Sequence, residues 1–150
     1  MPLVYADTSA LFAYFYPHDQ FSQEMDEAVK AESPDFVYWP LVRFELRHNL
    51  RRLMAEKYGV IAWRALRAAE KTTTRLRWHG ELTADRMLDS AEELSAERAA
   101  QLHCGSNDVL HVAAARRLHL LSGLDEFWTC DEAQADLSEA IGLPTRLFKE

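Results

Sequence analysis

The chain has 150 residues, of which 48% are hydrophobic and 27% charged, and its formal net charge is −7. This length and composition predict one compact domain, residues 1–150, with a core of its own, and they exclude a disordered chain. The acidic balance argues against a protein that coats nucleic acid without specificity.

The most apolar segment near the N-terminus, residues 3–16, is too short to cross a bilayer. It also contains Asp7 and lacks a basic lead-in, so it predicts neither a membrane span nor a secretory signal. Cys104 and Cys130 are expected to be reduced thiols of a cytoplasmic protein. His103 beside Cys104 suggests zinc, but no second spaced pair completes such a site.

Positive charge is concentrated in one sector of the chain. Residues 40–80 hold ten Lys and Arg against three Glu, a balance of +7, whereas the remainder carries −14. A solvated face is the ordinary explanation of such a sector. A footprint for phosphates or for an acidic partner is the alternative.

The first predicted elements are a buried strand at residues 3–6 and a helix that follows it directly. Thr8 or Ser9 is expected to cap this helix, and Pro17 ends it near residue 16. A second helix is predicted at about residues 21–31.

The middle of the chain begins with a predicted strand at residues 35–39. Pro40 suits the first turn of a helix that runs to about residue 57, with Gly59 just beyond its end. A further helix is predicted at about residues 60–73, followed by a short strand or loop at residues 75–82.

The last third predicts a long helix from Thr83 to about residue 102 and a helix, capped by Ser106 or Asn107, to about residue 119. A strand at residues 127–129, a helix at residues 131–140 and a strand at residues 145–148 complete the chain. Strands separated by helices, without tight hairpins, indicate a mainly parallel sheet covered by helices.

Two aspartates follow predicted strands. Asp7 ends the first strand, and Asp131 comes directly after residues 127–130. Ligands of open parallel sheets bind beyond the carboxyl ends of the strands. Both acids are therefore expected at that edge, although Asp7 alone is explained as a turn residue or a helix cap, and Asp131 alone is better explained as a helix cap.

Glu45 falls in the apolar stripe of the helix that follows the second strand, whereas Arg43, Arg47 and Arg51 form an opposite row. A carboxylate in such a stripe needs a partner. Arg52, seven residues on, is one candidate through an internal ion pair, and a metal ion is the other.

Asp108 opens a helix, residues 109–115, that is apolar on nearly every side. Alone, it is explained as an acid that balances the helix dipole. Carboxylates about 5 Å apart would repel by roughly 3 kcal/mol per pair, so the four acids together predict a site for a hard cation such as Mg²⁺ or Mn²⁺.

The segments VYADTSAL, FEL, NDVLHVAAA and WTCDEAQ resemble, in order and spacing, the PIN-domain ribonucleases, in particular the VapC-type toxins of bacterial toxin–antitoxin modules. The resemblance spans nearly the whole chain. It implies an α/β, PIN-like three-layer sandwich with a central, mainly parallel sheet flanked by helices.

The resemblance also implies which residues act. The family's four acids are matched by Asp7, Glu45, Asp108 and Asp131, and its hydroxyl positions by Ser9 and Thr129. Many members carry an arginine shortly before the third acid. Residues 104–107 replace it here, and Asn107 is expected to supply polar contacts instead.

The implied activity is endonucleolytic cleavage of RNA with Mg²⁺ or Mn²⁺ held by the four acids. Ser9 and Thr129 would orient ligands or water, or else only cap local turns. Asp125 and Glu126 are read either as auxiliary ligands or, preferably, as a solvated turn.

The implied partners are RNA, a cognate antitoxin protein and a second copy of the chain. The basic side chains expected to contact RNA or antitoxin are Arg43, Arg47, Arg51 and Arg52. Trp39 and Trp78 are candidates for base stacking, with core packing favoured. Residues 11–16 serve either the core or a dimer interface.

Two other functions are compatible with parts of the pattern. A noncatalytic PIN-like module that binds RNA or protein is the first, and the presence of all four acids counts against it. A haloacid-dehalogenase-like phosphatase is the second, but it needs an acid where Ser9 stands. The sequence leaves the RNA target and the antitoxin open.

Overall fold

The computed structural model describes residues 1–98 and 103–149, and it contains a five-stranded sheet in the order β3-β2-β1-β4-β5. The strands are β1 (Leu3–Ala6), β2 (Asp35–Tyr38), β3 (Leu76–Trp78), β4 (Glu126–Thr129) and β5 (Thr145–Leu147). Every pair of neighbouring strands is parallel, which confirms the predicted α/β class.

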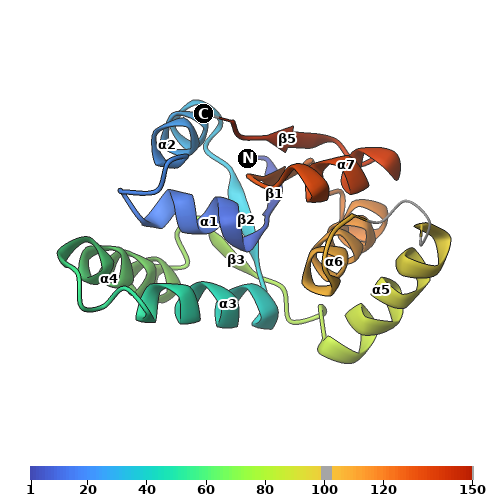
Figure 1. The fold of residues 1–150 in the computed structure, drawn as a ribbon, viewed down its shortest axis with the longest axis horizontal. Helices are drawn as coiled ribbons and strands as arrows, with labels where there is room; N and C mark the ends of the chain where they lie inside the picture. The colour runs from blue at the N-terminus through green and yellow to red at the C-terminus, as the bar shows by residue number, and fades with distance from the viewer. Residues whose placement is uncertain (99–102, 150) are drawn as a thin grey trace.

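Helices flank the sheet on both sides (Figure 1). They are α1 (Thr8–Phe15), α2 (Ser22–Glu32), α3 (Pro40–Arg51), α4 (Lys57–Thr72), α5 (Ala84–Arg98), α6 (Ser106–Ser122) and α7 (Glu132–Ala140). Helix α1 packs against α2, α3 and α4, whereas α6 packs against α5 and α7. In the described part of the chain, no helix combines the length and the apolarity needed to cross a membrane.

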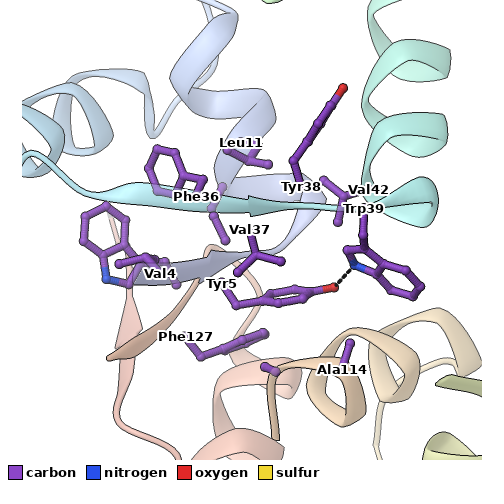
Figure 2. Packing of buried hydrophobic residues seen from close by; sticks show 14 of the residues in the cluster. Val4, Tyr5, Leu11, Phe36, Val37, Tyr38, Trp39, Val42, Ala114 and Phe127 are labelled. Atoms are coloured by element: carbon purple, nitrogen blue, oxygen red, sulfur yellow. Dashed lines mark hydrogen bonds between the residues drawn. The ribbon is translucent and has the colours of Figure 1, made fainter. Parts of the chain in front are cut away.

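The strand β1 lies at the centre of the sheet and of the core. Its residues Val4, Tyr5 and Ala6 are fully buried, as expected for a parallel strand covered on both faces (Figure 2). The chain runs outward from β1 to β2 and β3, then returns to place β4 and β5 on the other side. The crevice beyond the carboxyl ends of β1 and β4 is therefore where such sheets bind ligands.

Two predicted helix caps are wrong. Asp7, rather than Thr8 or Ser9, caps α1, because its carboxylate accepts a hydrogen bond from the Ala10 backbone N–H at 3.0 Å. Gly105, rather than Ser106 or Asn107, precedes the first turn of α6. By contrast, Asp131 caps α7 as predicted.

The helix predicted from Pro40 to about residue 57 ends earlier, at Arg51, and α4 begins at Lys57. Gly59 therefore lies inside α4 and does not cap α3. A Cβ atom at Gly59 would stand 1.8 Å from the carbonyl oxygen of Leu53, so glycine is needed there for close approach of the two segments.

Two further predictions concern the end of the helix α5 and the packing of residues 11–16. Helix α5 is described to Arg98, and its predicted end near residue 102 lies outside the described residues. In α1, Leu11, Ala13 and Phe15 are buried in the core, whereas Phe12 and Tyr14 are partly buried, so core packing is confirmed for the first three and a dimer interface stays a prediction for the rest.

Candidate functional site

Asp7 is the most deeply buried of the four predicted acids, with 2% of its surface exposed. Its carboxylate accepts hydrogen bonds from Ser9 Oγ at 2.7 Å, the Ala10 N–H at 3.0 Å and Thr129 Oγ1 at 3.1 Å. Burial raises the pKa of Asp7, and the nearby His111 and these donors offset that rise only in part. The fold thus holds a carboxylate whose charge is costly without a cation.

Glu45 projects from α3 toward the amino ends of α1 and α6. It accepts hydrogen bonds from Thr8 Oγ1 at 2.8 Å, Asn107 Nδ2 at 3.2 Å and His111 Nε2 at 2.7 Å. Burial alone would raise the pKa of Glu45, but these three donors outweigh it and the pKa is lowered. The ion pair with Arg52 considered from the sequence is absent from the described residues, because His111 takes that place.

A chain of buried hydrogen bonds reaches Glu45 from the core. The Trp39 indole N–H donates to Tyr5 Oη at 2.8 Å, and Tyr5 Oη lies 2.7 Å from Nδ1 of His111 (Figure 2 shows the first contact). Burial raises the pKa of Tyr5 well above its ordinary value, so its hydroxyl keeps the proton. The ionised Glu45 carboxylate can only accept, so His111 donates to it through Nε2–H, while Nδ1 and the Tyr5 hydroxyl share the second hydrogen bond of the ring.

Asp108 and Asp131 begin two neighbouring helices and share one partner. Gln134 donates through its side chain to Asp108 Oδ1 at 2.6 Å and through its backbone N–H to Asp131 Oδ1 at 3.2 Å. The other oxygen of Asp108 accepts from the Gly105 N–H at 3.1 Å. Gln134 therefore fixes the two carboxylates relative to each other.

Thr129 joins these acids to Asp7. Its Oγ1 atom donates to Asp7 and accepts from the backbone N–H of Asp131 at 3.0 Å. Ser9 Oγ, which donates to Asp7, likewise accepts from the Cys130 N–H at 3.2 Å. Each hydroxyl thus connects the end of β1 to the end of β4.

The structure places the seven predicted site residues in two hydrogen-bonded groups at the carboxyl edge of the sheet, one around Asp7, Asp108 and Asp131 and the other around Glu45. They are Asp7, Ser9, Glu45, Asn107, Asp108, Thr129 and Asp131. Within residues 1–98 and 103–149, no three His, Cys, Asp or Glu side chains have the arrangement of a ready-made metal site. Each of the four carboxylates instead accepts hydrogen bonds from protein donors, and their convergence on one cation stays a prediction.

The other predicted acids lie elsewhere. The Asp125 carboxylate accepts from the Leu3 N–H at 2.8 Å, and Glu126 is the first residue of β4. Both belong to the amino end of the strands, opposite the four acids. An auxiliary role at the site is therefore wrong for either residue.

Three of the four predicted basic contacts are occupied within the protein. The guanidinium of Arg43 lies 4.8 Å from the Trp78 ring, Arg47 bonds Glu70 at 2.5 Å, and Arg51 lies 5.1 Å from the Trp63 ring. Only Arg52 lines a cavity that adjoins the acids. Of the predicted stacking residues, Trp39 is buried and Trp78 is exposed.

Sequence reasoning missed three residues of the network: Thr8, His111 and Gln134. His111 stands three residues after Asp108, and Gln134 three residues after Asp131. Both His111 and Gln134 are polar residues on buried helix faces, one turn from a predicted acid, whereas Thr8 directly follows Asp7. That spacing was the available signal.

Comparison with known proteins agrees with this geometry. Residues 4–140 match the PIN domain family. A search of curated proteins finds no significant match. Among solved structures, the chain resembles VapC20 of Mycobacterium tuberculosis, described as a Sarcin-Ricin loop cleaving toxin, with 21% identity, a TM-score of 0.65 and coverage of 93% and 95% of the two chains.

Two further structures share the fold. VapBC2 of Rickettsia felis, bound to a DNA fragment from its promoter, has 14% identity, a TM-score of 0.64 and coverage of 98% of this chain and 99% of the other. A domain of a functionally unknown protein from Methanocaldococcus jannaschii has 17% identity, a TM-score of 0.56 and coverage of 100% and 93%.

Proposed function

Because the chain belongs to the PIN domain family, we propose that it is a metal-dependent endoribonuclease and the toxin of a type II toxin–antitoxin module. One observation carries this proposal. Four carboxylates lie at the ends of β1 and β4 and on α3 and α6: Thr129 and Gln134 connect Asp7, Asp131 and Asp108, and Asn107, next to Asp108 in the chain, donates to Glu45.

The donor set fits a divalent cation. All four predicted ligands are carboxylates, which suit hard cations such as Mg²⁺ or Mn²⁺. Asp131 Oδ2 accepts no hydrogen bond from the described residues, and each oxygen of Asp108 accepts one, although a carboxylate oxygen has two lone pairs. Acceptor capacity therefore remains for a cation.

In the proposed mechanism, Asp7, Glu45, Asp108 and Asp131 would hold one or two cations, directly or through water. A bound cation would lower the pKa of an attacking water and stabilise charge on the phosphodiester. The chain's own contribution is orientation. Ser9 and Thr129 hold the Asp7 carboxylate, His111 holds that of Glu45, and Gln134 that of Asp108.

Substrate and partners follow from the structural relatives, as part of the proposal. The description of VapC20 as a toxin that cleaves the Sarcin-Ricin loop supports RNA as the substrate class. The VapBC2 complex supports a cognate antitoxin. We also propose that the protein is a cytoplasmic homodimer and that each site binds one or two cations. The RNA sequence preference is to be determined by cleavage assays.

The test is cleavage of fluorescent single-stranded RNA in Mn²⁺ by the wild type, Asp7→Asn and Asp89→Asn. Asp89 is exposed on α5, so its variant makes the same chemical change away from the site. We expect cleavage that EDTA abolishes, loss of at least about a hundredfold in Asp7→Asn at matched folding, and no loss in Asp89→Asn. Equal cleavage by all three would refute the assignment.

A noncatalytic RNA-binding module remains the second candidate, and the same assay separates it. Such a module would bind the RNA and leave it intact in Mn²⁺. The phosphatase alternative loses its basis, because the chain belongs to the PIN domain family and Ser9 donates to Asp7 where that chemistry needs an acid.

A further inference from the structure

A cavity of about 610 Å³ adjoins the acid network on the side of α1 and α3. Ser9, Cys130 and Asp131 form the wall that it shares with the network. Phe12 and Phe21 supply aromatic surface to the same cavity. Its volume is within the range of pockets that hold small organic groups.

Helix α3 carries both the acid and the polar side of this cavity. Asn49 and Arg52 follow Glu45 by four and seven residues, and Arg52, the C-cap of α3, keeps helical backbone angles, so the three side chains lie on one side of the helix. At 1.5 Å per residue, they stand about 6 Å and about 10 Å beyond Glu45 along the axis. A strand that passes the acids would thus meet Asn49 first and Arg52 next.

Asn49 and Arg52 are available for a ligand. Within residues 1–98 and 103–149, neither side chain makes a hydrogen bond, ion pair or ring contact, and neither is among the residues with further interactions. Arg43, Arg47 and Arg51 on the same helix are all engaged with Trp or Glu side chains. Of these four arginines, Arg52 is the one whose side chain has no partner within the described residues, and it lines the cavity beside the acids.

The charge of the cavity selects between a phosphate and a base as its occupant. Asp19 and Asp131 also line it, so its interior disfavours an anion. Arg52 is exposed at the rim, whereas Phe12 and Phe21 are partly buried. A flat neutral group inside, with an anion at the rim, fits these walls.

We propose that this cavity receives the base of an RNA nucleotide next to the scissile phosphate. The Phe12 and Phe21 rings provide the stacking surface, Asn49 offers a donor and an acceptor to the base edge, and Arg52 contacts an adjoining phosphate. The inference rests on the proposed ribonuclease function and adds to it the place of substrate recognition.

The first experiment measures binding separately from cleavage. In the Asp7→Asn background, a pool of randomised, fluorescein-labelled ten-nucleotide RNAs is titrated against Phe21→Leu, Arg52→Gln and the control Arg64→Gln. Arg64 is exposed on α4 and does not line the cavity. We expect the first two variants to bind the RNA about tenfold more weakly, and the control to bind it with unchanged affinity.

A second experiment locates the contact directly. The same RNAs, with one 4-thiouridine at each position in turn, are cross-linked to the Asp7→Asn protein and the adduct is mapped by mass spectrometry. We expect adducts on the peptides that contain Phe12 or Phe21. Unchanged affinity in both cavity variants, or adducts only outside the cavity, would overturn the proposal.

Cleavage by otherwise wild-type chains distinguishes this inference from the proposed function. If the site recognises a base, Phe21→Leu and Arg52→Gln raise KM about tenfold and leave kcat within about twofold. RNA that binds in the cavity but is never cleaved by the wild type would contradict the ribonuclease proposal alone. Cleavage with unchanged KM in both variants would contradict the cavity alone.

Discussion

The Nε2 atom of His111 lies 2.7 Å from Oε1 of Glu45, although 66 residues separate them in the chain. Further hydrogen bonds hold both the His111 ring and the Glu45 carboxylate in place. Tyr5 occupies Nδ1 of the same imidazole, and Thr8 donates to the same carboxylate oxygen. The orientation of Glu45 at the site is therefore set by the core of the protein.

Replacing His111 by Phe is expected to reduce cleavage by about 10- to 100-fold, because Glu45 loses its buried donor. His111→Gln, which keeps a donor amide, should fall between this variant and the wild type. Steady-state cleavage in Mn²⁺ measures the effect, with thermal unfolding as the check on folding. Wild-type rates in a folded His111→Phe protein would show that Glu45 needs no such support.

Asp7→Asn is expected to stabilise the metal-free fold at neutral pH. Because burial raises the Asp7 pKa, the protonated form is favoured in the fold. The stabilising contribution of Asp7 is thus full below the unfolded pKa, about 3.9, and is lost as pH rises through the folded pKa.

The expected pattern in EDTA is equal stability of wild type and Asp7→Asn near pH 4. At pH 7.5 the variant should be more stable than the wild type, because the folded wild type must then bury a charged carboxylate. Urea unfolding at several pH values measures this difference, and Glu45, present in both proteins, cancels. A variant that is less stable by the same amount at every pH would contradict the assigned shift.

Gln134→Leu is expected to separate activity from stability. The side chain donates to Asp108 at 2.6 Å, but its buried Oε1 atom has no hydrogen-bond partner within the described residues. Loss of an unpaired buried oxygen offsets loss of the donor, so stability should change by less than about 1 kcal/mol. Cleavage should fall about tenfold, as for other residues that orient metal ligands.

The control for this variant is Gln20→Leu, at an exposed position in the turn before α2. It should leave both the rate and the melting temperature unchanged. If Gln134→Leu cleaves as fast as this control, the contact between Gln134 and Asp108 has no part in the reaction.

Gly59→Ala tests the observed junction between α3 and α4. The added Cβ would stand 1.8 Å from the Leu53 carbonyl oxygen, so the backbone must shift, at a cost of about 2–3 kcal/mol. Gly80→Ala is the matched control, since its Cβ would meet nothing closer than Trp78 Nε1 at 3.4 Å. Thermal unfolding should show a drop of several degrees for the first variant only.

Much of the fold was predictable because its signals are local. Apolar runs at β1 and β2 and the capping aspartate of α7 depend on adjacent residues, and the structure confirms them. The cap of α1 was not predictable, because Asp7, Thr8 and Ser9 are all capping residue types. The pairing of β1 with β4 ends at Ala6, and the Asp7 N–H still bonds the Trp128 carbonyl, so Asp7 is the first residue free to cap the helix.

The site likewise has a part that the sequence predicts and a part that it does not. The four acids follow from strand ends and from anomalies in helix faces, so the sequence alone predicts their edge of the sheet. Their bridging partners do not follow, since the contacts of His111 with Glu45 and of Gln134 with Asp108 span 66 and 26 residues. Only tertiary packing shows which polar side chain meets which acid.

The central claim is that the four carboxylates act together as a site for a divalent cation. Electron paramagnetic resonance of free Mn²⁺, titrated with the metal-free wild type, Asp7→Asn and Asp89→Asn, tests it most directly. We expect Mn²⁺ to bind the wild type and Asp89→Asn, and to bind Asp7→Asn at least about tenfold more weakly. Equal Mn²⁺ affinity of all three proteins, or no binding by the wild type, would contradict it.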